Sequence, residues 1–466
     1  MNSHPSIKTI ECRLDPVRFY SAFADRPDTA LLHSSMRTDA GRYSFVGLDP
    51  FMVVTSRGGR VGVSGETGTD INGLGPFEAL REVLDRYRFS NDTSLPFVAG
   101  GIGYLSYDLK NLTETLPQKA TDELATPEAR FSFYRTLVIF DAERPGMVTV
   151  SSIGAGSGKE QDPEGLIRFA TANCLDEASY ANEEYTTAPE ITSNFSRDDY
   201  IEAVGRTLEH IRRGDIYQLC LTQRFRTRWP DHPYRLYEKL NVINPAPFSA
   251  YLNSGDQRII SSSPELFLRR RGDTVETRPM KGTRPRGADG REDDRIKEEL
   301  RKSQKDVSEL LMIVDLERND LGKTAVPGTV EVAEHRRIET YPTVFQTIAV
   351  IRSRVRKDMD NIDVIRSAFP GGSITGCPKI RAMEIIDSLE TTARGVYTGS
   401  IGYLSFHGDM DLNIAIRTMV YKNGEVFFQA GGGIVSDSDP GAEYEESLVK
   451  ARALAESLGA RVNSAQ

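Results

Sequence analysis

The chain has 466 residues, about three times the length of a typical domain, which predicts two or three domains or one large fused body. Hydrophobic residues make up 39% of it and charged residues 27%, which excludes a coiled coil, a collagen and a disordered chain. A formal net charge of −9 gives no attraction to nucleic acid or an anionic membrane, and no stretch approaches the roughly 20 apolar residues of a membrane span. With no export signal and four cysteines outside any CxxC pair, the sequence predicts a soluble cytoplasmic enzyme.

The first 180 residues alternate short apolar runs with turns, a pattern that predicts a mainly β region carrying a few helices. Residues 43–47 and 61–63 are typical of strands, and residues 76–87 have helical spacing. The segment Ile-Gly-Tyr-Leu-Ser occurs at 102–106 and again at 401–405. Five shared residues predict two similar strands rather than a structural repeat.

Two polar segments, 151–165 and 180–194, lack apolar periodicity and predict surface connections. We therefore divide the chain into an N-terminal region over 1–180, a linker over 181–194 and a second domain over 195–460.

The pattern of elements is clearer in the second domain. Ser196 can cap a helix that Gly214 can end, and the apolar residues between them fall on one helical face. Further helices are predicted over 308–321, 378–389 and 441–458, and strands over 216–225, 347–355 and 426–430. Because strands and helices follow one another without regular βαβ alternation, we predict the α+β class.

Residues 278–287 read RPMKGTRPRG and place four cations among two prolines and two glycines. Such a segment is usually a solvated basic surface, and a nucleic-acid patch is a second alternative. The prolines predict a rigid loop, however, and no aromatic residues interleave as single-strand binding requires. A rigid loop that presents Lys281 suits an anionic substrate or an amine nucleophile.

Two predicted helices each carry a pair of acids three residues apart: Asp306 with Glu309, and Glu443 with Glu446. Such pairs are usually exposed, but Glu309 precedes the stretch LLMIVDL over 310–316, which is apolar except for Asp315. The second pair follows a glycine-rich segment starting at 431, predicted to be a turn whose N–H groups can bind an anion. Four carboxylates beside an anion site predict Mg²⁺ and a carboxylate substrate. Six unclustered histidines argue against zinc.

Six segments then occur in order, and they carry a resemblance to a known family. They are GDIYQLCLTQR from 214, SSPELF from 262, the 278–287 segment, IVDLERNDLG from 313, FPGGSITGCPK from 369 and the glycine-rich segment from 431. Together they resemble the chorismate-utilising enzymes, which include the anthranilate, aminodeoxychorismate, isochorismate and salicylate synthases. The resemblance is weaker in the N-terminal region, where LLHS from 31 and RYSFVG from 42 carry it.

The resemblance implies two interleaved subdomains of large, mostly antiparallel sheets flanked by helices, with Mg²⁺-chorismate in a deep cleft of a catalytic domain over 195–460. It implies that Glu309 and Glu446 bind Mg²⁺ directly, with Asp306 and Glu443 acting through water. Glu265 matches the general acid. The positions that match substrate contacts are Gln218, Thr283, Ser373, Gly376, Tyr397, Arg417, Gly431, Gly432, Gly433 and Lys450.

Two positions indicate the branch of the family. Gln218 stands where the water-using relatives have a lysine, and Lys281 stands where anthranilate synthases usually have alanine. The chain thus resembles aminodeoxychorismate synthase component I, in which the lysine amine adds at C2 of chorismate as the C4 hydroxyl leaves. Ammonia then adds at C4, giving the precursor of 4-aminobenzoate and folate.

No glutaminase signature is present, so the resemblance implies that a separate glutamine amidotransferase supplies the ammonia. Two alternatives stay open: anthranilate synthase component I, and a non-catalytic regulatory homologue, against which Glu265, Lys281 and the four acids argue. Gln346 departs from a histidine of many relatives, and LLHS from 31 departs from a pattern linked to tryptophan feedback.

Overall fold

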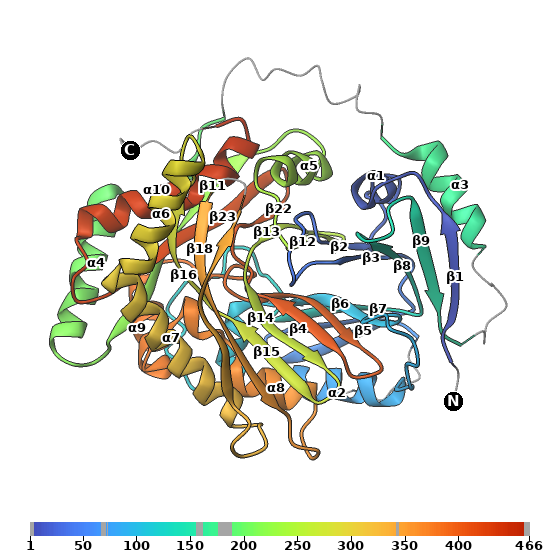
Figure 1. The fold of residues 1–466 in the computed structure, drawn as a ribbon, viewed down its shortest axis with the longest axis horizontal. Helices are drawn as coiled ribbons and strands as arrows, with labels where there is room; N and C mark the ends of the chain where they lie inside the picture. Colours follow the sequence, from blue (N-terminus) through green and yellow to red (C-terminus); the bar gives the residue numbers. More distant parts are fainter. Residues whose placement is uncertain are drawn as a thin grey trace.

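The computed structural model consists of two large β-sheets that pack together and carry helices on their outer faces (Figure 1). It describes residues 4–66, 71, 73–154, 162–175, 189–341 and 344–460. Residues 181–188 of the predicted linker lie outside this part of the chain. None of the helices in the described ranges is long and apolar enough to cross a membrane.

The first sheet has twelve strands in the described residues, and their pairings are antiparallel. Its order along the sheet is β1 (Ser6–Glu11), β9 (Met147–Ser152), β8 (Thr136–Asp141), β3 (Tyr43–Gly47), β2 (Ala30–His33), β12 (Phe248–Asn253), β13 (Arg258–Ser263), β22 (Thr418–Lys422), β23 (Glu425–Ile434), β11 (Gln218–Arg228) and β10 (Thr192–Ser193). The short strand β19 (Gly376–Cys377) pairs with the start of β11.

The second sheet has eleven strands. Its order is β16 (Met280–Pro285), β18 (Val344–Arg354), β15 (Thr274–Arg278), β14 (Leu266–Arg271), β21 (Met410–Asn413), β20 (Ser400–Ser405), β6 (Gly100–Leu105), β7 (Ala129–Tyr134), β4 (Met52–Arg57) and β5 (Arg60–Gly65), with β17 (Glu331–Thr340) beside β18. The two Ile-Gly-Tyr-Leu-Ser segments are neighbours here, because β6 pairs with β20 and Gly103 lies opposite Gly402.

Both sheets contain strands from 1–180 and from 195–460, so the predicted α+β class with interleaved antiparallel sheets is confirmed. The division of the chain into two regions at residues 181–194 stays a prediction.

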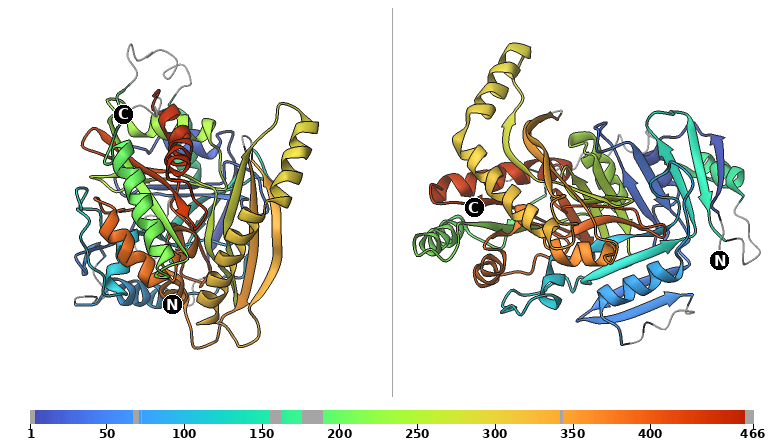
Figure 2. Two further views of the ribbon diagram at one scale, coloured as in Figure 1. Left: turned by 90° about the vertical axis from the view of Figure 1, so that its left-hand side faces the viewer. Right: turned by 60° about the horizontal axis from the view of Figure 1, so that its bottom comes forward.

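Helices cover the outer faces of both sheets (Figure 1). On the first sheet lie α1 (Pro16–Ser21), α3 (Pro163–Asn173), α4 (Arg197–Arg212), α5 (Pro233–Ile243), α9 (Lys379–Leu389) and α10 (Pro440–Ser457). On the second lie α2 (Pro76–Arg86) and α7 (Gln304–Gly322). Helix α8 (Asn361–Ala368) packs against these two helices. Helix α6 (Gly290–Lys302) contacts β16 and α7 and projects beyond the two sheets (Figure 2).

The strand period of two separates the two hydrophobic cores. In β12, Ala250 and Leu252 belong to the core between the sheets, whereas Tyr251 faces the helices. Tyr251 there packs edge-on against Tyr234 of α5, with ring centroids 5.0 Å apart. Strand β12 is therefore buried on both of its faces.

Two sequence predictions about local structure were wrong, and both concern the site described below. The predicted loop at 278–287 contains strand β16, since its backbone pairs with β18. The predicted turn at Gly431 and Gly433 is the end of β23, opposite Thr222 and Cys220 of β11. A Cβ atom on Gly431 would lie 2.0 Å from the carbonyl oxygen of Leu221, so the missing side chain allows this close pairing.

A buried ion pair behind β11 connects several segments through hydrogen bonds. The Arg394 guanidinium donates to both oxygens of Glu390, and the two side chains are 1% and 4% exposed. Arg394 also donates to the carbonyl oxygens of Cys220 in β11 and of Ile374 in the 3-10 turn η3 (Gly372–Ile374). Glu390 accepts from the backbone and side chain of Thr222.

We predict that Arg394→Met lowers the free energy of unfolding by about 3–5 kcal/mol, because it leaves the Glu390 carboxylate buried without its partner. Urea denaturation measures this loss. The matched control is Arg381→Met, which removes an exposed pair with Glu384 on α9 and should cost less than about 1 kcal/mol. Equal losses in the two variants would contradict the structural role of Arg394.

Candidate active site

Glu265 follows strand β13 and is only 4% exposed. Burial raises the pKa of Glu265 to about 7, although the hydrogen bond from Ser373 and the charge of Lys281 act in the opposite direction. The Ser373 hydroxyl lies 2.6 Å from Oε1 of Glu265. A carboxyl group whose pKa is raised toward neutrality can hold a proton and release it, which suits a proton donor.

Lys281 projects from β16 toward the glycine-rich end of β23. A Cβ atom on Gly433 would lie 3.2 Å from Nζ of Lys281 and 2.5 Å from Nε2 of Gln218. Both polar groups thus occupy the space that a side chain at Gly433 would take. Gln218 is fully buried, and neither atom of its amide has a hydrogen-bond partner within the described chain. An unpartnered buried amide beside an amine is available to a ligand.

A bulge in β16 next to Lys281 brings helix α7 close to this strand. The register of β16 shifts between Lys281 and Thr283, and the intervening Gly282 has φ +69°, a conformation that favours glycine. A Cβ atom on Gly282 would lie 3.1 Å from the Asp306 side chain. Thr283 accepts a hydrogen bond of 3.3 Å from the Gln346 amide. Asp306 accepts one of 2.8 Å from Arg284.

The two acids of α10 lie beside the glycine segment on its other face. A Cβ atom on Gly432 would lie 3.0 Å from Oε2 of Glu443, 3.4 Å from Nζ of Lys450 and 3.7 Å from Oε1 of Glu446. Lys450 donates to Glu446 at 2.6 Å and to the Gly431 carbonyl oxygen at 3.0 Å. The Lys450 charge lowers the pKa of Glu446, whereas burial raises the pKa of Glu443.

The backbone of the glycine segment also presents polar groups. The amides of Thr222 and Cys220 donate to Glu390 and Thr375, so their pairs with Gly431 and Gly433 are the non-hydrogen-bonded ones. The N–H groups of Gly431 and Gly433 therefore point away from β11. The expected anion contacts of these amides stay a prediction, and the segment that carries them is a strand and not a turn.

The predicted metal-binding residues supply hard oxygen donors from two helices. Glu309 of α7 lies 3.9 Å from Lys305 on the same helix, and Glu443 and Glu446 lie on α10. Glu443 is buried, and its Oε2 atom has no hydrogen-bond partner in the described chain. This donor chemistry fits Mg²⁺. Within the described ranges, however, no three acidic, histidine or cysteine side chains are already gathered around one point.

Tyr397 and Arg417 form a third part of the site. Burial lowers the pKa of Arg417 and raises that of Tyr397, and the two groups interact electrostatically. Arg417 has φ +52°, an uncommon conformation for a residue with a side chain. Among the residues that the structure describes, none forms an ion pair with Arg417, which leaves its charge for an anionic ligand. Gly376 completes this region next to the Gln218 backbone.

Glu317 lies near Glu265, and the sequence analysis did not predict it as a site residue. It lies on the buried face of α7 and accepts a 2.9 Å hydrogen bond from Thr277. Burial and the nearby Glu265 raise the pKa of Glu317 well above its usual value. The helical spacing could have indicated its burial, because Glu317 shares one helical face with Leu310, Ile313 and Leu321.

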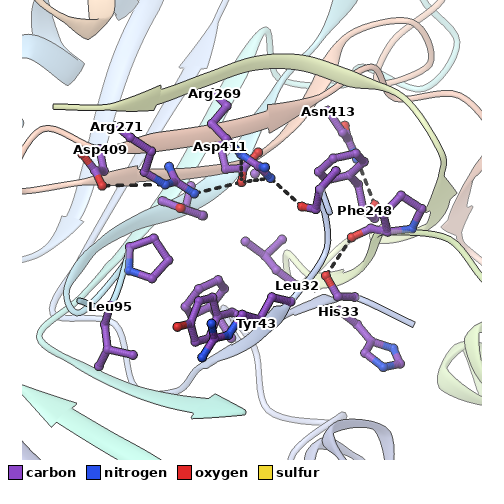
Figure 3. Close-up of a pocket in the computed structure, with 18 of the residues that line it drawn as sticks. Leu32, His33, Tyr43, Leu95, Phe248, Arg269, Arg271, Asp409, Asp411 and Asn413 are labelled. Atoms are coloured by element: carbon purple, nitrogen blue, oxygen red, sulfur yellow. Dashed lines mark hydrogen bonds and ion pairs between the residues drawn. The ribbon is translucent and has the colours of Figure 1, made fainter. Parts of the chain in front are cut away.

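A cavity of about 630 Å³ lies apart from these residues, between β2, β3 and the β14–β21 pair (Figure 3). Leu32, His33 and Tyr43, from the two N-terminal segments that carried the family resemblance, line it. Arg269 and Arg271 on its wall form ion pairs with Asp411, and Arg271 also pairs with Asp409. None of Lys281, Glu265 or the four acids lines this cavity, so it is separate from the candidate active site.

The chorismate binding enzyme family matches residues 33–456, so the chain belongs to this family. Anthranilate synthase component 1 of Acetivibrio thermocellus is 36% identical over 458 residues, covering 95% of this chain and 92% of that protein. Aminodeoxychorismate synthase component 1 of Escherichia coli is 37% identical over 458 residues, covering 97% and 98%. The two kinds of relative are equally similar, so identity does not distinguish them.

A solved structure gives the same result for the fold. Anthranilate synthase component I from Streptococcus pneumoniae superimposes with a TM-score of 0.77 at 30% identity, covering 90% of this chain and 93% of that one. The fold is therefore that of anthranilate synthase component I.

The burial of Glu265 predicts a pH-dependent stability. An unfolded glutamate ionises near 4.5, whereas the folded one keeps its proton up to about 7. The folded state thus binds more protons in this window, and the free energy of unfolding falls as pH rises, by about 3 kcal/mol in total. Urea denaturation from pH 4.5 to 7.5 should show a fall in the wild type that is larger than the fall in Glu265→Gln by about this amount, since Glu317 and other buried acids contribute to both. A constant difference between the two would contradict the buried titration.

Proposed function

We propose that this chain is component I of an aminodeoxychorismate synthase, which aminates chorismate to 4-amino-4-deoxychorismate for 4-aminobenzoate and folate synthesis. The position of Lys281 carries the proposal. Its amine and the Gln218 amide both lie against Gly433, and its charge acts on Glu265 and Glu446. A single amine thus acts on both the proposed proton donor and one acid that would hold the metal.

In the proposed reaction the Lys281 nitrogen forms a bond to C2 of chorismate while the C4–O bond breaks. The buried carboxyl of Glu265 gives its proton to the departing oxygen, which leaves as water. Ammonia then forms a bond to C4, the bond from C2 to Lys281 breaks, and the amine is restored. The sum is chorismate and ammonia in, aminodeoxychorismate and water out. The pyruvyl enol ether is retained.

Two groups of residues support binding of a dicarboxylate. The Arg417 cation and the Tyr397 hydroxyl form one, and Lys450 with the Gly431 and Gly433 amides forms the other. Mg²⁺ would be held by Glu309 and Glu446, with Asp306 and Glu443 acting through water, and when bound it supplies positive charge beside a substrate carboxylate. We propose a separate glutamine amidotransferase subunit as the ammonia source, since the relatives are named as first components.

The rival function is anthranilate synthase, because anthranilate synthases are equally similar to this chain. Product identification decides between them. The protein is incubated with chorismate, Mg²⁺ and an ammonium salt, and the product is separated by chromatography with fluorescence detection. Non-fluorescent aminodeoxychorismate supports the proposal, and fluorescent anthranilate with pyruvate overturns it. Absence of turnover, with chorismate still bound, would support a non-catalytic homologue.

We predict that Lys281→Ala loses about 10²–10⁴-fold in rate, since a two-step displacement becomes a direct attack by ammonia. Residual activity should survive because Glu265 and the substrate contacts remain. Wild-type protein quenched during turnover without ammonia should carry a chorismate-derived mass on the peptide that contains Lys281, and the alanine variant should not. No adduct together with an unchanged rate would make Lys281 an ordinary cation of β16.

Glu309→Gln and Glu446→Gln are each expected to abolish turnover without unfolding the protein, because each removes one ligand charge. Turnover is measured at saturating and limiting Mg²⁺, and circular dichroism checks the fold. Full activity of either variant at limiting Mg²⁺ would show that its carboxylate is a surface charge.

A further inference from the structure

Strand β16, which carries Lys281, lies at the edge of the second sheet. Within the described residues it pairs with β18 alone, and the register of this pairing shifts at Gly282, next to Lys281. A bulge disrupts the hydrogen-bond ladder locally, and an edge strand has no second neighbour to compensate for the loss. The hydrogen bonds of the sheet alone therefore do not fix the position of Lys281.

Helix α6 packs against β16 at this bulge. Most residues of α6 are charged, and Leu300 is the apolar side chain that the helix buries. A Cβ atom on Gly282 would lie 2.9 Å from Cδ1 of Leu300, so the leucine occupies the space that the glycine leaves open. The helix thus contacts the strand one residue away from Lys281.

Two polar contacts hold α6 in this place. Arg286, which follows β16, donates to Asp293 of α6 at 2.9 Å. Lys297 of α6 lies 4.9 Å from the ring centre of Phe345, a fully buried residue of β18. A cation at this distance from an aromatic ring is attracted to it. The helix is therefore fastened both to the end of β16 and to its neighbour β18.

We propose that Leu300 is a positioning residue for Lys281: it fills the space beside Gly282, fixes the bulge of β16 and so holds the Lys281 amine against Gly433. The kinetic consequence rests on the proposed function, whereas the placement of the amine does not. A displacement of about 1 Å can cost an aligned reaction about 100-fold in rate. Leu300 therefore acts on the chemical step, although it lies outside the site and contacts no substrate.

The reactivity of the Lys281 amine, measured without chorismate, tests the placement. Each protein is treated briefly with acetic anhydride, and mass spectrometry follows acetylation of the peptide that contains Lys281. Acetylation should be faster in Leu300→Ala than in the wild type, because the amine leaves its contacts with Gly433 and Gln218 more often. Leu300→Met should restore the wild-type rate, since methionine has a similar volume and refills the space.

The matched control is Leu80→Ala, which truncates another buried leucine on a helix of the same sheet. Leu80 is 1% exposed and lies on α2, which packs against β4 and β5 at the opposite end of that sheet from β16. It reports what a general loss of stability does to Lys281. Acetylation of Lys281 in Leu80→Ala should match the wild type.

Steady-state kinetics gives the second readout. Leu300→Ala should lower kcat by about 10–100-fold and change KM by less than about 3-fold, because the substrate contacts remain while the amine is misplaced. Leu80→Ala and Leu300→Met should keep both constants near their wild-type values. Circular dichroism checks the fold, and Leu300→Val, expected to show a smaller effect in the same direction, takes the place of an alanine variant that does not fold.

Unchanged acetylation of Lys281 or an unchanged kcat in the folded Leu300 variant would overturn the inference and leave the proposed function intact. Equal effects in Leu80→Ala would also overturn it, since Leu300 would then be an ordinary core residue. If the wild type makes no aminodeoxychorismate, the proposed function fails, and faster acetylation in Leu300→Ala would still support the placement.

Discussion

The candidate site depends on the buried pair of Arg394 and Glu390. This pair holds the carbonyl oxygens of Cys220 and Ile374 and the amide of Thr222 in one hydrogen-bond network. Because the network sits directly behind β11, it sets where that strand lies relative to η3 and β23. A buried ion pair adds little net stability when compared with apolar packing, but its directional bonds restrict geometry. Here that restriction positions the strands that carry the candidate site.

On that surface the two sheets supply different chemistry. The first sheet contributes Gln218 and the glycine segment of β23, and the second contributes Lys281 on β16. The amine meets its surroundings only because the sheets pack face to face. Because Gly433 has no side chain, Lys281 and Gln218 fill the space beside it. Three residues from distant parts of the chain therefore meet at this point of the candidate site.

Burial and charge pairing give the acids of this region different roles. Glu265 and Glu317 lie in an enclosed environment, which favours their protonated forms. Glu446 lies beside Lys450 and stays ionised. Carboxyl groups of one chemical type thus divide into protonated and ionised groups according to their surroundings, as the proposed reaction requires.

The sequence by itself determined the elements and the chemical types of the site. The Ser196 cap, the helical spacing of α2, α9 and α10, and the ordered motifs predicted them, because caps and periodicity are local signals. Only the tertiary structure decided that 278–287 and 431–433 contain strand, since pairing with β18 and β11 overrides the local preference for turns. It also decided which groups meet: the position of Lys281 beside Gln218 and Gly433 and the burial of Glu317 near Glu265 depend on contacts between segments far apart in the chain. Such contacts leave no local periodicity for a sequence to display.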